Sequence, residues 1–425
     1  MSGIQAVAQR LFGERDGSAW PSRRRVCAYA ALLLGLEITG LAFFVAGTHG
    51  WIVALKGPVS TDFVSFYAAG LLADAGTPAL VYQQAAHHAA EQAATQPGIP
   101  YNYFYYPPIF ILLCALFARL PYLPAFLAFQ AATLLPCLLT ARRILHQSGW
   151  AIMLPLLAFP AVFYTLGTGQ NAFLTAALFG AATLLVDRRP VLAGLLFGTL
   201  CYKPHFGLLV PVALAAGGRW RAFAAAAITV AALTGLSALA FGWDTWQAFF
   251  AAAANARHVY EAGISQAGLT SPFGVVLVLG GRPALAYQVQ AAATLMAMAS
   301  VGVVWWRGSS QPVRAAMLTA ATPIALPVVQ FYDLMLSGIA LAWLVQLGQQ
   351  RSLPARYSTV MAMLFVTTLL SGNFDPHSPL MIAPLVAAGT FLLTLVAALG
   401  EMCATHTHLS DGMEFSRTSA RSHNQ

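Results

Sequence analysis

Charged side chains are scarce in this sequence. Asp, Glu, Lys and Arg together make up 8% of the 425 residues, whereas hydrophobic residues make up 58%, and the mean hydropathy is +0.68. Soluble domains average about 25% charged residues, and they need these residues to cover their surfaces. The composition therefore excludes a soluble globular protein.

Patterns that would indicate metal or nucleotide chemistry are also missing. The five cysteines are odd in number, four of them lie within apolar stretches, and their spacing matches neither a disulfide framework nor a metal site. No DxD-like cluster is present that would bind a nucleotide sugar through a metal. We expect no cofactor and no metal.

Apolar runs recur along the chain instead. A transmembrane helix needs about 20 predominantly apolar residues, and runs of this kind cover, for example, 26–46, 220–241 and 381–398, with a shorter one at 317–329. We predict an all-α, polytopic membrane protein with about ten to thirteen transmembrane or half-length helices. Kinks or short helices are expected near Pro121, Pro124 and Pro204, because proline removes a helix donor and clashes with the preceding turn.

The two ends of the chain differ from the middle. Arg23 to Arg25 precede the first apolar run as in a signal peptide, but the run is too long and no small-residue cleavage site follows, so we expect a retained first helix. The tail is polar, with little periodicity, and is typical of disorder. The expected parts are a cytoplasmic segment (1–25), a transmembrane domain (26–399) and a disordered cytoplasmic tail (400–425).

Lys and Arg exceed Asp and Glu, which gives a formal net charge of +8. The basic residues lie in short clusters between apolar runs, as topology signals do, and not in a patch for nucleic acid. The positive-inside rule places these clusters in the cytoplasm: Arg23 to Arg25, Arg142-Arg143, Arg188-Arg189, Arg219/Arg221, Arg307/Arg314 and Arg351/Arg356. The exterior connections are then 49–106, 165–171, 243–271, 330–333 and 372–378. We expect a bacterial inner membrane protein whose active site faces the periplasm or exterior.

The first outer connection, 49–106, is too long for a plain loop. Its parts 61–75 and 82–95 have helical patterns and are expected to lie flat on the membrane surface. The connection closes with the aromatic run Tyr101 to Pro108. This run is either an interfacial aromatic belt or a stacking wall for a sugar or lipid headgroup.

Polar residues within or beside apolar runs are the candidate site. Such residues cost about 2.5–3.5 kcal/mol when charged and inserted, so they tend to face cavities and to serve function. Asp62 is either a helix cap or a site residue. Lys203 has no acid nearby in sequence, so it pairs either with an anionic ligand or with a distant acid, Asp62 or Asp333. The other members are Gln170, Asn171 and His205.

Five short motifs together resemble glycosyltransferase family 87. They are Asp62 to Tyr67 (DFVSFY), Tyr106-Pro107-Pro108, Gly169-Gln170-Asn171, Ala193-Gly194-Leu195 and Lys203-Pro204, in an order that covers about residues 30 to 350. The resemblance implies a helical bundle of the GT-C membrane fold and a polyprenyl-phosphate-mannose-dependent mannosyltransferase, a transferase of the cell envelope. It also implies that Asp62 is the catalytic base.

The residues suit this chemistry. A base must take the proton of the acceptor hydroxyl, and positive charge must stabilise the departing phosphate; we assign the phosphate to Lys203, with His205 and His258 as helpers. A single carboxylate suits inversion, and Asp333 is the alternative second acid of a retaining pair. Substrate-binding candidates are Tyr67, Tyr106, Gln170, Asn171, Gln330, Tyr332 and Asp333. The expected partners are a polyprenyl-phosphate sugar, a glycolipid or glycan acceptor and the lipid bilayer.

One segment departs from the family pattern. The mannosyltransferases carry a late histidine-containing loop, whereas this chain has Leu326 to Leu336 (LPVVQFYDLML). The transferred sugar is therefore mannose or another hexose or pentose, with Gln330, Tyr332 and Asp333 expected in place of the histidine. The connection 243–271 either closes over an acceptor or is a plain connector. The alternative functions are a transporter or flippase of a lipid-linked sugar and a non-catalytic subunit.

Overall fold

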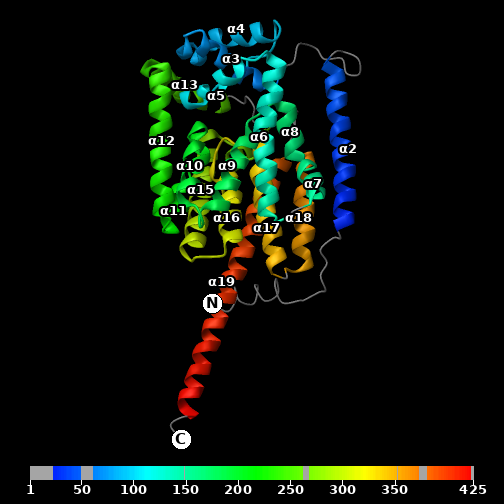
Figure 1. Cartoon of the computed structure of the whole chain (residues 1–425), viewed down its shortest axis with the longest axis vertical. Helices are drawn as coiled ribbons and strands as arrows, with labels where there is room; N and C mark the ends of the chain where they lie inside the picture. The colour runs from blue at the N-terminus through cyan, green and yellow to red at the C-terminus, as the bar shows by residue number, and fades with distance from the viewer. Residues whose placement is uncertain are drawn as a thin grey trace.

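The structure is a computed structural model that describes residues 23–48, 61–147, 149–261, 268–351, 353–372 and 381–422 (Figure 1). Within these ranges the chain is helical, and extended backbone pairs in one isolated antiparallel bridge between Leu269 and Gln330.

Six helices among the described residues are long and apolar enough to cross a membrane. They include or lie within α2 (Arg23–Thr48), α6 (Tyr122–Ile144), α12 (Trp220–Phe241), α15 (Pro283–Trp306), η6 with α17 (Phe331–Leu334 and Met335–Gln350) and α19 (Ile382–Ser422). Large apolar side chains remain exposed on these helices, such as Leu239 at 88% and Ile228 at 67% on α12. Such a surface is stable against lipid and not against water. The prediction of an all-α polytopic membrane protein is confirmed.

Shorter helices fill the space between the spans. They are α3 (Phe63–Asp74), α4 (Gln84–Ala94), α5 (Pro108–Ala118), α7 (Met153–Leu157), α8 (Pro160–Thr168), α9 (Ala172–Leu185), α10 (Pro190–Thr199), α11 (Val210–Ala216), α13 (Trp243–Glu261), α14 (Pro272–Val278), α16 (Gln311–Ala325) and α18 (Ala355–Thr367). Short 3-10 turns link them: η1 (Pro78–Tyr82), η2 (Trp150–Ile152), η3 (Leu200–Tyr202), η4 (Pro204–Gly207) and η7 (Thr368–Leu370).

A break at Lys203-Pro204 places a charged residue inside the bundle. Helix α10 begins at Pro190, directly after the basic pair Arg188-Arg189, and rises for ten residues, or roughly 15 Å. This length is about half of a 30 Å hydrocarbon core. The residue before a proline avoids the helical region, and Lys203 has φ −134° and ψ 70°. The predicted half-length helices are therefore present, and Lys203 lies buried at the break that follows α10 and η3.

The half-length helices pack closely because small residues line the contacts. A Cβ added to Gly194 on α10 would lie 2.3 Å from the Ala222 carbonyl oxygen on α12 and 2.6 Å from the Ala225 Cβ. Only glycine permits this approach, as in other membrane helix pairs.

The helices of the first outer connection lie at one end of the molecule. Figure 1 shows α3, α4 and α13 at the end opposite to the C-terminal part of α19. Helix α6 begins at this end and finishes with Arg142 and Arg143 in its last turn. The helices predicted at 61–75 and 82–95 are present as α3 and α4.

Two expectations differ from the structure. Much of the connection 243–271 is not a loop, because residues 243–261 form α13, whose run Ala251 to Ala254 has the highest intrinsic helix propensity. The tail expected to be disordered from residue 400 is helical to Ser422 as the end of α19. An existing helix extends more easily than a new one starts, since each added residue gains a hydrogen bond without a new nucleus.

Candidate active site

The carboxylate of Asp62 does not cap the helix that it precedes. Asp62 is half-buried at the start of α3, and its side chain makes no capping hydrogen bond there. Its Oδ2 instead accepts a hydrogen bond of 2.9 Å from Gln170 Nε2, and its backbone N–H donates to the Thr168 carbonyl at 2.7 Å. The carboxylate therefore joins α3 to the turn between α8 and α9.

Gly169 makes this turn possible. It ends α8 in the left-handed region, with φ 73° and ψ 25°, where an L side chain is strained. A Cβ at this position would also lie 2.9 Å from the Cβ of Phe63. The glycine of the GQN motif thus lets the backbone approach α3, and the next residue, Gln170, reaches Asp62.

Burial raises the pKa of Asp62, and the hydrogen bond from Gln170 lowers it in part. Removing a carboxylate from water penalises its charged form, whereas a donor stabilises that form. The net direction is upward, which suits a group that must accept a proton near neutral pH.

Tyr106 connects the two polar parts of the site. Its hydroxyl donates to Gln170 Oε1 at 3.4 Å. Burial raises the pKa of Tyr106 well above its usual value, and the negative charges of Asp333 and Asp62 raise it further. The phenol therefore stays protonated and lies within electrostatic reach of both acids. Tyr106 is thus joined to Asp62 through Gln170 and is also sensitive to the charge of Asp333.

Lys203 forms a buried ion pair with Asp333. The distance from Nζ to Oδ1 is 2.8 Å, and the two side chains are 7% and 3% exposed. The ammonium also lies 4.4 Å from the centre of the Phe206 ring and 5.7 Å from that of Tyr332, where the negative faces of aromatic rings attract a cation. The sequence left open whether Lys203 pairs with an anionic ligand, with Asp62 or with Asp333, and in the structure it pairs with Asp333.

Short extended segments around Leu269-Thr270 and Val329-Gln330 pair with each other and position Asp333. The Thr270 N–H donates to the Val329 carbonyl at 2.7 Å, and Leu269 bridges Gln330. The backbone N–H of Gln330 in turn donates to Asp333 Oδ2 at 3.2 Å. The connection 243–271 thus contributes to the site at its end, through the backbone of Leu269 and Thr270 and through the hydroxyls of Thr270 and Ser271, which donate to the Val329 and Pro327 carbonyls.

Asn171 is a buried amide without a described partner. It is 0% exposed, and neither its oxygen nor its nitrogen has a hydrogen-bond partner among the described residues. Its side chain is nevertheless close enough to the Tyr106 hydroxyl to lower the pKa of that phenol in part, as a hydrogen-bond donor does. An unsatisfied buried polar group costs about 1–3 kcal/mol, so this side chain has the character of a group that awaits a ligand.

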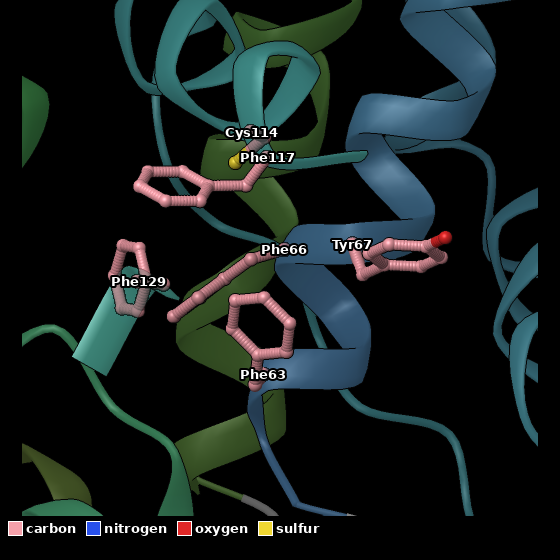
Figure 2. Close-up of a pocket in the computed structure, with 6 residues that line it drawn as sticks. All are labelled: Phe63, Phe66, Tyr67, Cys114, Phe117 and Phe129. Carbon is pink, nitrogen blue, oxygen red and sulfur yellow. The ribbon is translucent and has the colours of Figure 1, made fainter. Parts of the chain in front are cut away.

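A packed aromatic cluster anchors α3 below Asp62. Its members are Phe63, Phe66 and Tyr67 of α3, Cys114 and Phe117 of α5 and Phe129 of α6 (Figure 2). Phe63 and Phe129 lie 5.4 Å apart between ring centres, and Phe66 and Phe129 lie 5.9 Å apart. Tyr67, predicted to bind substrate, has its hydroxyl bonded to the Leu120 carbonyl at 2.9 Å. In the structure Tyr67 therefore contacts the residues of this cluster, and its predicted role in binding substrate stays a prediction.

Of the two histidines proposed as helpers of Lys203, one lies near it and the other lies on α13. His205 is exposed on η4, with its ring centre 4.9 Å from that of Phe206. His258 lies on α13, is 59% exposed, and has its Nδ1 3.7 Å from Glu261 Oε2. His205 therefore shares the Phe206 ring with Lys203 and lies within reach of its positive charge, whereas the contact described for His258 is with Glu261.

The sequence analysis overlooked Glu37, the one acid of the first apolar run. Glu37 is 3% exposed in α2, and its carboxylate oxygens have no hydrogen-bond partner among the described residues. The signal was visible, since an acid inside a spanning segment is costly and tends to be functional. Its charge reaches Tyr164 on α8.

The fold and the site together define a polytopic membrane protein with an acid–amide–tyrosine group and a buried cation around one polar centre. The chain belongs to glycosyltransferase family 87, whose sequence profile matches residues 104–329, a little over half of the chain. Tyr106, Gln170, Asn171 and Lys203 lie inside the matched stretch, and Asp62 lies before it. No curated protein and no solved structure matches the chain. Family membership makes the protein a membrane glycosyltransferase and favours this class over the transporter and the non-catalytic subunit.

Proposed function

We propose that this glycosyltransferase moves a hexose or pentose from a polyprenyl-phosphate donor to a glycolipid or glycan acceptor at the outer face of a bacterial inner membrane. The observation that carries the proposal is the connected polar group formed by the start of α3, the turn between α8 and α9 and the segment that ends at Tyr106. Asp62 bonds to Gln170, Gln170 bonds to Tyr106, and Tyr106 lies within electrostatic reach of the Lys203–Asp333 pair.

Asp62 acts as the base in this proposal. The acceptor hydroxyl oxygen attacks the anomeric carbon and forms the new glycosidic bond while its proton passes to the Asp62 carboxylate. The bond from the anomeric carbon to the phosphate oxygen breaks, and polyprenyl phosphate leaves with the electron pair. The raised pKa of Asp62 makes it a better proton acceptor than an exposed aspartate. Gln170 holds the carboxylate in one orientation.

Lys203 stabilises the departing phosphate. Negative charge grows on this group in the transition state, and a preorganised cation in a dry site is most effective there. A lysine ammonium has three donors, of which Asp333 accepts one. Lys203 is only 6% exposed, so the phosphate in this proposal is drawn inward from the headgroup level, with its isoprenoid chain in the surrounding lipid.

Asp333 acts as the counter-ion of Lys203 and not as a second catalytic acid. Its Oδ1 is bonded to Lys203 and its Oδ2 accepts from the Gln330 backbone, so both oxygens are already engaged. A retaining mechanism would need a second free carboxylate about 5 Å from the first. A single displacement with inversion is therefore the better fit. Asn171, Tyr332 and the side chain of Gln330 are the groups that we assign to sugar hydroxyls.

The test is Asp62→Asn against Asp74→Asn in membranes supplied with a panel of polyprenyl-phosphate sugars. Asp74 lies at the other end of the same helix, is exposed, and contacts Arg119 at 3.7 Å, so it is a matched control. We expect Asp62→Asn to lose at least about 10²-fold in transfer, the lower range for a general base, with donor binding retained. Near-normal turnover of Asp62→Asn would remove it as the base, and no turnover of the parent with any lipid-linked donor would remove the donor class.

A further inference from the structure

Helix α4 buries a histidine and a glutamate on one face. His87 and Glu91 are one helical turn apart, both side chains are 0% exposed, and Nδ1 lies 3.7 Å from Oε1. The helix is otherwise rich in Ala and Gln, and Glu almost never becomes fully buried unless it is paired. The ring of His87 packs against Tyr101 and Phe104, with centres 5.7 and 5.8 Å away. Burying two ionisable groups is costly, so their retention on this face indicates a role.

Their hydrogen bonds run to two different parts of the chain. His87 Nε2 lies 3.0 Å from the Ser65 carbonyl oxygen on α3, and the Asn102 backbone N–H donates to Glu91 Oε2 at 3.2 Å. A carbonyl only accepts, so Nε2 carries the proton, and Nδ1 of the neutral ring is an acceptor that faces Glu91. Ser65 Oγ completes the connection by donating to the Tyr103 carbonyl at 3.4 Å.

The two tied segments are those that deliver the proposed catalytic groups. Ser65 lies three residues after Asp62 on α3, and the extended segment that contains Asn102 ends at Tyr106, which bonds to Gln170. We infer that His87 and Glu91 are positioning residues, which fix α3 and the 100–106 segment against each other and thereby set Asp62 relative to Tyr106. The inference rests on the proposed roles of those two residues.

The ionisation of the pair supports this role. Burial raises the pKa of Glu91 to about 8, the Asn102 N–H lowers it in part, and the charge of Asp62 raises it. Burial lowers the pKa of His87 to about 4, against the hydrogen bond to Ser65. Between these values the pair is uncharged. The titratable groups that face it are His88 on α4, Asp62 on α3, Tyr101 in the extended segment and Tyr122 on α6.

The sign of the pH dependence follows. Above about pH 8 Glu91 loses its proton, and its new negative charge then faces the lone pair of His87 Nδ1 and the carboxylate of Asp62. Both interactions are repulsive, so the pair opens and its hold on the two segments weakens. We expect turnover to fall as the pH rises through the pKa of Glu91.

The experiment compares His87→Ala, His88→Ala and Glu91→Gln in the full-length protein, by amide hydrogen exchange of residues 101–106 and by transfer kinetics. His88 is the comparison on the same helix, because it contacts the connection at the Ile99 carbonyl (2.8 Å) and at the Tyr101 ring (5.6 Å between centres), whereas His87 also bonds to the Ser65 carbonyl on α3. Glu91→Gln keeps the acceptor for Asn102 but cannot ionise, and it covers the case in which His87→Ala does not fold.

We expect His87→Ala to speed exchange of 101–106 and to lower kcat by about tenfold or more with little change in KM, since misplacement of about 1 Å can cost 10²-fold. His88→Ala, which leaves the bond to α3 intact, should speed exchange less and keep kcat close to that of the parent, and Glu91→Gln should keep its turnover above pH 8. Equal effects of His87→Ala and His88→Ala on exchange, or an unchanged alkaline loss in Glu91→Gln, would overturn the inference. Exchange needs no substrate, so this result stands even where the proposed transfer reaction fails.

Discussion

The Lys203–Asp333 pair offers a decisive test, because a structural ion pair and a phosphate site predict opposite results for one double variant. In Lys203→Met the Asp333 carboxylate is left buried at 3% exposure without its cation, and in Asp333→Asn the ammonium is left without its anion. Breaking a buried pair from one side costs about 3–5 kcal/mol. Each single variant should therefore unfold at a clearly lower temperature in detergent micelles.

The double variant Lys203→Met/Asp333→Asn removes both charges and should recover most of the lost stability, since replacing a whole buried pair is often close to neutral. The side-chain oxygen of the introduced asparagine can still accept from the Gln330 N–H, which Asp333 Oδ2 does at 3.2 Å in the parent. In this variant the effect on stability can therefore be measured separately from the effect on the transfer rate.

Transfer decides between the two roles. If Lys203 stabilises the departing phosphate, the refolded double variant should remain about 10²–10³-fold slower than the parent, the cost of losing one donor to a developing anion. The assay is the initial rate of glycolipid extension, followed by mass spectrometry, at protein amounts normalised to folded material. Recovery of the rate to within about threefold of the parent, less than 1 kcal/mol, would refute the phosphate role and leave a structural pair.

Three further results are expected. Gln170→Leu removes the hydrogen bond that lowers the pKa of Asp62, so the pKa of Asp62 should rise. Because the base must be unprotonated to react, the acid limb of the kcat/KM profile should move to higher pH. Rates measured over a pH series test this. Gly169→Ala should lower stability by more than about 1 kcal/mol, whereas Gly76→Ala, with φ 77° and open space around it, bears only the backbone strain; equal losses of melting temperature would contradict the clash. Asn171→Leu removes an unsatisfied buried amide and should leave stability unchanged or higher while transfer falls; unchanged transfer rates would exclude Asn171 from sugar binding.

The sequence alone was sufficient for the class of fold and for most of the polar residues that meet in the site. Apolar runs with few charges have no stable arrangement except membrane helices, so the composition determined the architecture. The same scarcity made Asp62, Gln170, Lys203 and Asp333 conspicuous. A proline restricts the backbone of the residue before it, and this effect is local. The break at Lys203-Pro204 could therefore be predicted from the sequence.

Only the tertiary structure decided which polar groups face each other. Lys203 and Asp333 are 130 residues apart and Asp62 and Gln170 are 108 apart, and no local pattern relates residues at such separations. The same holds for His87 and Glu91: in sequence they belong to a polar surface helix, and their burial appears only when α3 and the 100–106 segment pack over them. Local propensity fixes where helices begin and end, whereas the partner of a buried charge depends on how those helices pack. In the low dielectric of the interior, leaving such a charge without its partner costs several kcal/mol of folding free energy.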